Sequence, residues 1–294
     1  MAGRIVLIIG NGFDLDIGLN TSYQNFIDSG ALSKYRNQEI IKILLQTYKA
    51  QNWIDVEEFF RSKAISMTNY ASDHILQAFD YVRESLLTYI KNISYKSLND
   101  NPTAIKILRE VLDASDVKIF NFNYTDLQKI CNHYNIPLTH EPIYIHGSAS
   151  NDSIILGFDD DAIPRNKDCC RMIKSHSEYF FSANINESLE EADEVIFFGH
   201  SLGVTDYHYF RNFFLSQAKI QDKEKFRKKI IRIFTYDEKA RLKILLQLRE
   251  MNERKTNMLY DLNNFAIYRT LNDQTKIQTY CNALKSRINA PILW

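Results

Sequence analysis

The apolar run Ile5–Ile9 and the glycines after it constrain the fold of this chain more than any other feature. Five apolar residues in a row end at Gly10-Asn11-Gly12, where an amphipathic segment begins. A short apolar run bounded by glycine is typical of a strand buried on both faces, as in a parallel sheet. Glycines at a strand-to-helix turn also let the backbone approach a bound phosphate closely. The sequence therefore predicts an α/β protein whose first turn is either a phosphate-binding loop or a tight turn without a ligand.

The glycine spacing differs from that of the common dinucleotide-binding loop. The pattern G-x-G-x-x-G requires a third glycine at the position of Leu15, and Gly18 comes too late in the chain. The loop is thus a candidate of a non-standard kind, and both interpretations stay open.

Further apolar runs predict the rest of a parallel sheet. We expect strands at residues 117–120, 143–145, 153–156, 194–198 and 229–234, with an edge strand at 265–268. We expect helices from about 127 to 134, at 169–185, at 238–251 and near 275–288. This alternation of strands and helices favours a Rossmann-like parallel sheet.

A long helical stretch interrupts this pattern. Residues 32–98 contain neither proline nor glycine, and their apolar residues recur at helical spacing. Two or three long helices exceed what a simple crossover between parallel strands needs. We therefore expect a single α/β domain over residues 1–294 with a largely helical insertion at about 30–112, in which Trp53, Phe59 and Phe60 are core or interface residues.

Composition narrows the class of protein. The 36 basic and 36 acidic side chains leave a net charge of zero, which disfavours a general nucleic-acid binder. The local basic run at 223–232 is interpreted as a solvated helix end. The four cysteines form no CxxC pair, so neither a zinc ribbon nor a redox motif is expected, and free thiols fit a reducing cytoplasm. No apolar stretch is long enough for a signal peptide or a membrane span, so a cytoplasmic protein is expected, and its oligomeric state is left open.

Polar residues gather where the predicted strands end. Seven of the nine glycines follow predicted strands or the first turn. In an open parallel sheet the carboxyl ends of the strands face the ligand crevice, so residues far apart in the chain should meet there. The residues expected to converge are Asn11, Asp14, Asn123, His146, Asp159, His200 and Ser201.

Two of these residues have a chemical interpretation and a structural one. His146 can serve as a general base near neutral pH or cap the end of a strand. Asn123 can hold a sugar hydroxyl or a water, or bond a loop backbone. A metal site built from His146, Asp159, Asp160 and His200 lacks any recognised ligand spacing, so no metal is expected.

The segment from Gly199 to Gly203 matches the nucleophile elbow G-x-S-x-G. It would make Ser201 a nucleophile, but the only histidine after it is His208, seven residues on. A Ser201 hydrolase is therefore the lesser alternative to a tight turn whose hydroxyl caps the next helix.

The chain resembles the AbiH family of bacterial phage abortive-infection proteins. The resemblance lies in IIGNGFDLDIGLNTSYQNF at 8–26, FNFNYTD at 120–126, IHG at 145–147, GFD at 157–159 and FGHSLGVTDYHYF at 198–210. It implies a cytoplasmic bacterial protein that aborts phage infection. A phage-derived trigger and a homo-oligomer are the partner hypotheses that we carry with it.

A more distant resemblance is to the sirtuin-like NAD-binding fold. Residues 10–14 are similar to the sirtuin G-A-G-I-S loop, 121–125 to T-x-N-x-D, 146–147 to the H-G that carries the base, and 199–204 to G-T-S-L-x-V. The resemblance implies that Asn123 orients the nicotinamide ribose or a water and that His146 is the base. It further implies cofactor-binding roles for Gly10, Asn11, Gly12, Phe13 and Asp14 at the pyrophosphate, and for Gly199, His200 and Ser201 at the adenosine half.

The departures from the sirtuin pattern change the expected reaction. Asp14 stands where sirtuins have serine, Thr125 stands where they have aspartate, and the sirtuin zinc cysteines are missing. A protein deacetylase is thus not expected. The two hypotheses carried forward are an NAD hydrolase and a nucleotide-binding sensor or scaffold without catalysis.

Overall fold

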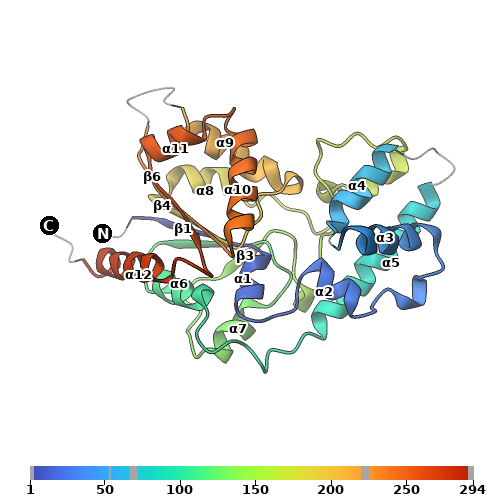
Figure 1. Ribbon diagram of the computed structural model, residues 1–294, viewed down its shortest axis with the longest axis horizontal. Coiled ribbons are helices and arrows are strands. Elements are labelled where there is room, and N and C mark those ends of the chain that lie inside the picture. The colour runs from blue at the N-terminus through green and yellow to red at the C-terminus, as the bar shows by residue number, and fades with distance from the viewer. Residues whose placement is uncertain (1–2, 53, 67–71, 220–225, 291–294) are drawn as a thin grey trace.

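The computed structural model describes residues 3–52, 54–66, 72–219 and 226–290, and its centre is a six-stranded parallel sheet (Figure 1). The strand order is β3-β2-β1-β4-β5-β6. The strands are β1 (Ile5–Ile9), β2 (Val117–Asn121), β3 (Pro142–Tyr144), β4 (Glu194–Phe198), β5 (Ile230–Thr235) and β6 (Asn264–Arg269). This is the doubly wound order, with its topological switch point between β1 and β4, and it confirms the Rossmann-like prediction.

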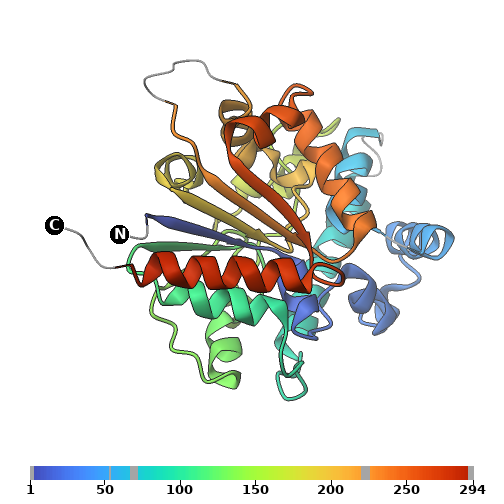
Figure 2. The same cartoon turned by 60° about the vertical axis from the view of Figure 1, so that its left-hand side comes forward.

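Helices cover both faces of the sheet because its central strands are apolar on both faces. Ile5, Leu7 and Ile9 pack against one helical layer, and Val6 and Ile8 pack against the other. The first layer contains α1 (Asn11–Asp16), α6 (Thr103–Leu112), α7 (Leu127–His133) and α12 (Gln274–Ile288). The second contains α8 (Ile185–Glu191), α9 (Tyr207–Gln217), α10 (Glu238–Met251) and α11 (Thr256–Leu262). Figure 2 shows α12 and α6 running side by side along the sheet.

A second core lies beside the carboxyl edge of the sheet. It is built from α2 (Tyr23–Asp28), α3 (Glu39–Gln51), α4 (Val56–Ser66) and α5 (Ser72–Lys91), together with part of the segment 149–173. Phe26, Phe60 and Phe158 are fully buried in it, and Phe59 is buried as expected. Trp53 lies outside the described residues. We refer to α2–α5 as the helical insertion, since α6 packs on the sheet instead.

Three local predictions are wrong. Residues 153–156 form no strand; Ile154 and Leu156 pack into the core of the helical insertion, and the segment pairs with none of the strands of the described sheet. Residues 169–185 form no long helix but two short 3-10 turns, η4 (Lys167–Met172) and η5 (Lys174–His176), followed by an irregular segment. The basic run at 223–232 is not a solvated helix end where it is described: Lys229 and Arg232 are buried, and Arg232 lies in β5. Residues 223–225 lie outside the described part of the chain.

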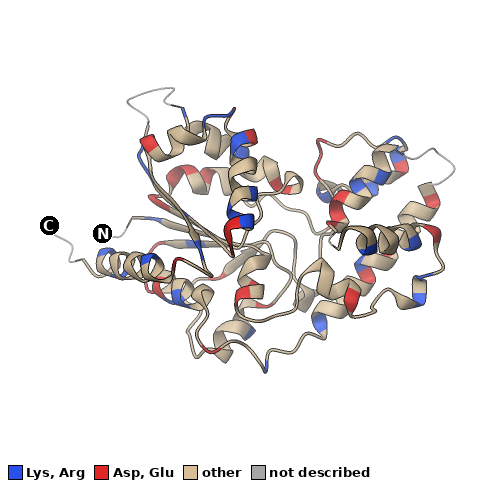
Figure 3. Cartoon of the chain, in the orientation of Figure 1, with Lys and Arg blue, Asp and Glu red and all other residues tan. Residues whose placement is uncertain are grey.

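Charges of both signs are interspersed over the sheet-covering helices and the helical insertion (Figure 3). The four cysteines are unpaired thiols. Within the part of the chain that the structure describes, every helix is too short or too polar to cross a lipid bilayer.

Candidate functional site

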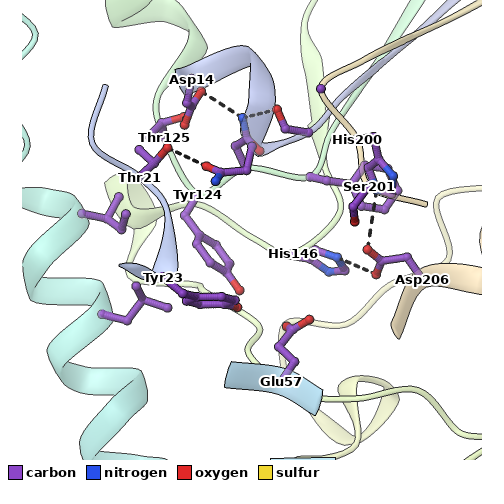
Figure 4. A pocket seen from close by; sticks show the side chains of 17 residues that line it. Asp14, Thr21, Tyr23, Glu57, Tyr124, Thr125, His146, His200, Ser201 and Asp206 are labelled. Atoms are coloured by element: carbon purple, nitrogen blue, oxygen red, sulfur yellow. Dashed lines mark hydrogen bonds and ion pairs between the residues drawn. The ribbon is translucent and has the colours of Figure 1, made fainter. Parts of the chain in front are cut away.

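A cavity of about 170 Å³ lies between the carboxyl edge of the sheet and the helical insertion (Figure 4). The loops after β1, β2, β3 and β4 supply one side of its wall. Helices α2, α4 and α5 supply the other side through Tyr23, Glu57, Leu86 and Ile90. The cavity therefore lies at the switch point, where ligands of doubly wound sheets bind.

Most residues expected at the site do line this cavity. They are Gly10, Asn11, Asp14, Asn123, His146, Gly199, His200 and Ser201. Asn11 and Ser201 are exposed, whereas Asn123, His146 and His200 are buried, so the rim and the floor of the cavity differ in character.

Gly12 and Phe13 lie behind the cavity. The Gly12 N–H donates to the Gly199 carbonyl at 2.9 Å, and the Phe13 N–H donates to the Gly10 carbonyl at 2.8 Å. The Phe13 ring is buried in the core, edge-on to Phe198. These two residues thus shape the first turn and offer no free N–H to a ligand in the cavity.

The loops after β1 and β4 touch through their glycines. Gly199 has a φ of +67°, and a Cβ there would lie 2.4 Å from the Cα of Gly12. Only glycine fits such a position without strain and without pushing the loops apart. The first glycine of the G-x-S-x-G match, Gly199, therefore has a packing explanation.

Asp14 forms a buried hydrogen-bonded cluster with two residues of the β2 loop. Its carboxylate accepts from the Asn123 amide at 2.9 Å and from the Thr125 hydroxyl at 2.8 Å. The Asn123 amide nitrogen also donates to the Gly10 carbonyl at 3.1 Å, which fixes the orientation of the amide. Burial raises the pKa of Asp14 to about 7, although both side-chain hydrogen bonds act against this rise.

Asp206, from the turn before α9, organises the basic groups of the floor. Its carboxylate lies 3.0 Å from Nε2 of His146, 2.9 Å from Nζ of Lys174 and 3.5 Å from Nε2 of His200. Burial opposes the charge on Asp206, but Lys174 and His146 together hold its pKa well below the usual range. The carboxylate is thus ionised at neutral pH.

The contact with Asp206 determines the form of His146. Burial, and then the positive charge of Lys174, lower the pKa of His146 to about 4, so the ring is neutral at pH 7. Nε2 lies 3.0 Å from the Asp206 carboxylate and 3.5 Å from Nζ of Lys174, and we assign the proton of the neutral ring to Nε2 because the carboxylate can only accept. Nδ1 is then the unprotonated nitrogen and can accept a proton.

Both ring nitrogens of His200 are engaged within the protein. Its Nδ1 accepts the Leu202 N–H at 3.0 Å, which leaves the proton on Nε2, toward Asp206. His200 therefore closes the turn after β4 and supports Asp206, and neither of its ring nitrogens is left to act as a base.

Glu57 brings a second carboxylate to the floor from the helical insertion. It lies 3.2 Å from Nζ of Lys174 and accepts the Gly157 N–H at 3.3 Å. Burial raises the pKa of Glu57 to about 7, with Lys174 acting in the opposite direction. Lys174 is 2 % exposed, and the two carboxylates raise its pKa above the ordinary value despite its burial.

Sequence reasoning missed Glu57, Lys174 and Asp206. Asp206 stands within the motif at 198–210, directly before a helix, and its position near a strand end could have indicated it. Glu57 and Lys174 carry no such signal, because Glu57 reaches the cavity from the helical insertion and Lys174 lies behind the lining, paired with Glu57 and Asp206.

Ser201 and Asp159 lie apart from this network. Among the described residues Ser201 forms no hydrogen bond with a histidine, and Nδ1 of His208 is bonded to Asp159 at 2.7 Å instead. Asp159 does not line the cavity; it also accepts the Asp160 N–H. Over residues 3–52, 54–66, 72–219 and 226–290, no group of three or more His, Cys, Asp or Glu is placed to hold a metal ion.

The strand order and a cavity at the switch point define a Rossmann-like α/β protein with a candidate ligand site. A family model described as bacteriophage abortive infection AbiH matches residues 6–226. The chain therefore belongs to the AbiH family, which suggests a role in abortive-infection defence against bacteriophage. No curated protein matches the chain.

Proposed function

We propose that this protein binds NAD or a related nucleotide in the cavity and hydrolyses its N-glycosidic bond during phage infection. The observation that carries the proposal is the meeting of Gly10, Asn123 and His146 at one cavity. They follow three different strands, yet they gather at the switch point of the sheet. Loss of NAD would stop the metabolism of the infected cell, which fits a family that aborts infection.

The two departures from the sirtuin pattern also support the proposal. Asp14 and Thr125 replace a serine and an aspartate, and they lie against each other at 2.8 Å. Through this contact, and through its bond to the Asn123 amide, Asp14 joins the loop after β1 to the loop after β2. The two residues that depart from the pattern thus help to hold Asn123 in place.

The floor of the cavity supplies the groups that the reaction needs. Nδ1 of His146 takes a proton from water as its oxygen bonds to C1′ of the ribose. The C1′–N bond breaks, and its electron pair neutralises the ring nitrogen of the departing nicotinamide. The Asn123 amide nitrogen is held by Gly10 and Asp14, so its oxygen is the atom that would accept from a ribose hydroxyl or from the water.

The rim suits the rest of a nucleotide. A cavity of about 170 Å³ encloses only part of a dinucleotide, so the phosphates and the adenosine would lie toward the exposed Asn11 and Ser201. In this arrangement Gly12 and Phe13 contribute by holding the first turn in place. Since the proposed substrate pool is that of the bacterial cytoplasm, we place the protein there.

Mixing the purified protein with NAD and following free nicotinamide tests the proposal. We expect nicotinamide release, with or without lysate from phage-infected cells. Removal of the base by His146→Ala should lower the rate by about 100-fold or more while the far-ultraviolet circular dichroism is retained. Absence of both NAD binding and nicotinamide release under all these conditions would refute it.

A nucleotide sensor without catalysis is the second candidate. The helical insertion supplies part of the cavity wall, so a bound nucleotide could alter how the insertion presents its outer surface to a phage-derived partner. Nucleotide that leaves the denatured protein uncleaved, together with toxicity that survives His146→Ala and Asn123→Ala, would favour the sensor.

A further inference from the structure

We infer that Glu57, carried by the helical insertion, is a further catalytic residue, whose carboxylate faces the ribose–nicotinamide end of the substrate and stabilises the positive charge of the transition state. The inference rests on the proposed function and extends it to a group that no sequence motif indicated. Figure 4 shows the Glu57 carboxylate at the cavity floor, across from His146 and next to Tyr23.

The position of Glu57 is built by its neighbours. Asp55 accepts the backbone N–H groups of Glu57 and Glu58 at 3.0 and 3.1 Å, which fixes the first turn of α4. The Gly157 N–H and Lys174 bond to the carboxylate from its far side. A Cβ at Gly157 would lie 2.2 Å from the Met172 carbonyl oxygen, so only glycine allows the backbone at residue 157 to lie this close to the backbone at Met172.

The charges of the floor favour a cationic group. Glu57 and Asp206 are two carboxylates that share one cation, Lys174. Both carboxylates line the cavity, but Asp206 contacts Lys174 and two histidines, whereas Glu57 contacts Lys174 and one backbone N–H and has no histidine partner. A buried carboxylate that lines a cavity stabilises positive charge that develops there, because the low dielectric constant strengthens the attraction.

This charge pattern matches the chemistry of the proposed bond cleavage. The ring of oxidised nicotinamide is cationic before cleavage, and positive charge moves onto C1′ and the ring oxygen of the ribose as the bond breaks. The Glu57 carboxylate would stabilise that charge. His146 takes the proton of the attacking water. The products are ADP-ribose, neutral nicotinamide and one proton.

The test compares Glu57→Gln with Glu58→Gln in the full chain. Both variants remove one carboxylate from the same turn of α4, but Glu58 pairs with Arg61 and does not line the cavity. Glu57→Gln leaves Lys174 paired with Asp206, so the network keeps a balanced ion pair. Nicotinamide release and NAD affinity are measured for both variants and for the parent protein, and circular dichroism checks the fold.

We expect kcat to fall at least 100-fold in Glu57→Gln, with NAD affinity changed less than tenfold, and we expect Glu58→Gln to match the parent within twofold. If the parent protein is active and a folded Glu57→Gln variant keeps more than a third of the parent's kcat, the inference is overturned but the proposed hydrolysis is not. A parent protein that binds NAD without cleaving it, or does neither, overturns both the inference and the proposed hydrolysis. If Glu57→Gln does not fold, Glu57→Asp, which withdraws the carboxylate by one methylene, takes its place, and an unchanged kcat there counts against the inference.

Discussion

The contact between Gly199 and the first turn leads to a prediction about stability. In Gly199→Ala the new Cβ would lie 2.4 Å from Cα and C of Gly12 and from the backbone nitrogen of Phe13. A residue with a side chain at a φ of +67° costs about 1–2 kcal/mol in backbone strain. Overpacking against backbone costs about 1–3 kcal/mol more, and the stiffer unfolded chain offsets about 0.4–1 kcal/mol of the total. We therefore expect Gly199→Ala to lower the free energy of unfolding by about 2–4 kcal/mol.

Gly203→Ala is the matched control, because both glycines belong to the same G-x-S-x-G match. Gly203 has a φ of −68°, and its added Cβ would meet only the Ser201 hydroxyl, at 3.3 Å. Its free energy of unfolding should stay within about 1 kcal/mol of the parent protein.

Thermal unfolding followed by circular dichroism measures the difference. At about 2–4 °C per kcal/mol, Gly199→Ala should lower the Tm by roughly 4–16 °C. Equal Tm values for Gly199→Ala and Gly203→Ala would show that the two loops separate freely, and the close contact would then not hold the cavity together.

Two further predictions concern the buried charges. Asp14→Asn should unfold at a higher temperature than the parent protein at pH 8, and the difference should be smaller at pH 5. The pKa of Asp14 is about 7 in the folded state and near 4 in the unfolded state, so the parent protein takes up a proton on folding and loses stability as the pH rises from about 4 to 7. The variant lacks this carboxyl group, so paired melts should show the slope in the parent protein but not in the variant. Lys174→Met leaves Glu57 and Asp206 buried without their cation and should lower the free energy of unfolding by about 3–5 kcal/mol. The control Lys91→Met, at an exposed ion pair, should lower it by less than about 1 kcal/mol. Equal losses for the two variants in urea unfolding would contradict the burial of the Lys174 ion pairs.

The sheet could be predicted because its strands are short apolar runs. The expected positions for β1, β2, β4, β5 and β6 agree with the structure to within one or two residues. Residues 153–156 have the same apolar character but form no strand, since α5 and its neighbours bury them. An apolar run predicts that a segment is buried, but it does not predict whether a strand or a helix packs against that segment.

The candidate site could be predicted only where it follows strand ends. Asn123 and His146 were found because the carboxyl ends of parallel strands share one edge of the sheet. Lys174 was placed inside an expected helix at 169–185, where it would have been one solvated charge among others. Its role depends on Glu57, more than a hundred residues before it, and on Asp206, about thirty residues after it. The periodicity of a sequence carries no information about such long-range contacts.

The cavity belongs to neither core alone. The sheet supplies His146, Asn123 and Asp206, and the helical insertion supplies Glu57 and part of the apolar wall. Lys174 pairs with Glu57 of the helical insertion and with Asp206 of the loop before α9, so it links the insertion to the floor of the cavity. Every residue that lines the cavity lies within the span 6–226 matched by the AbiH family model. Strands β5 and β6, which complete the sheet, and α12, which packs on it, lie outside that span. The matched span is thus the part of the chain that builds the cavity, and any activity of the family that depends on this cavity requires the insertion to be packed against the sheet.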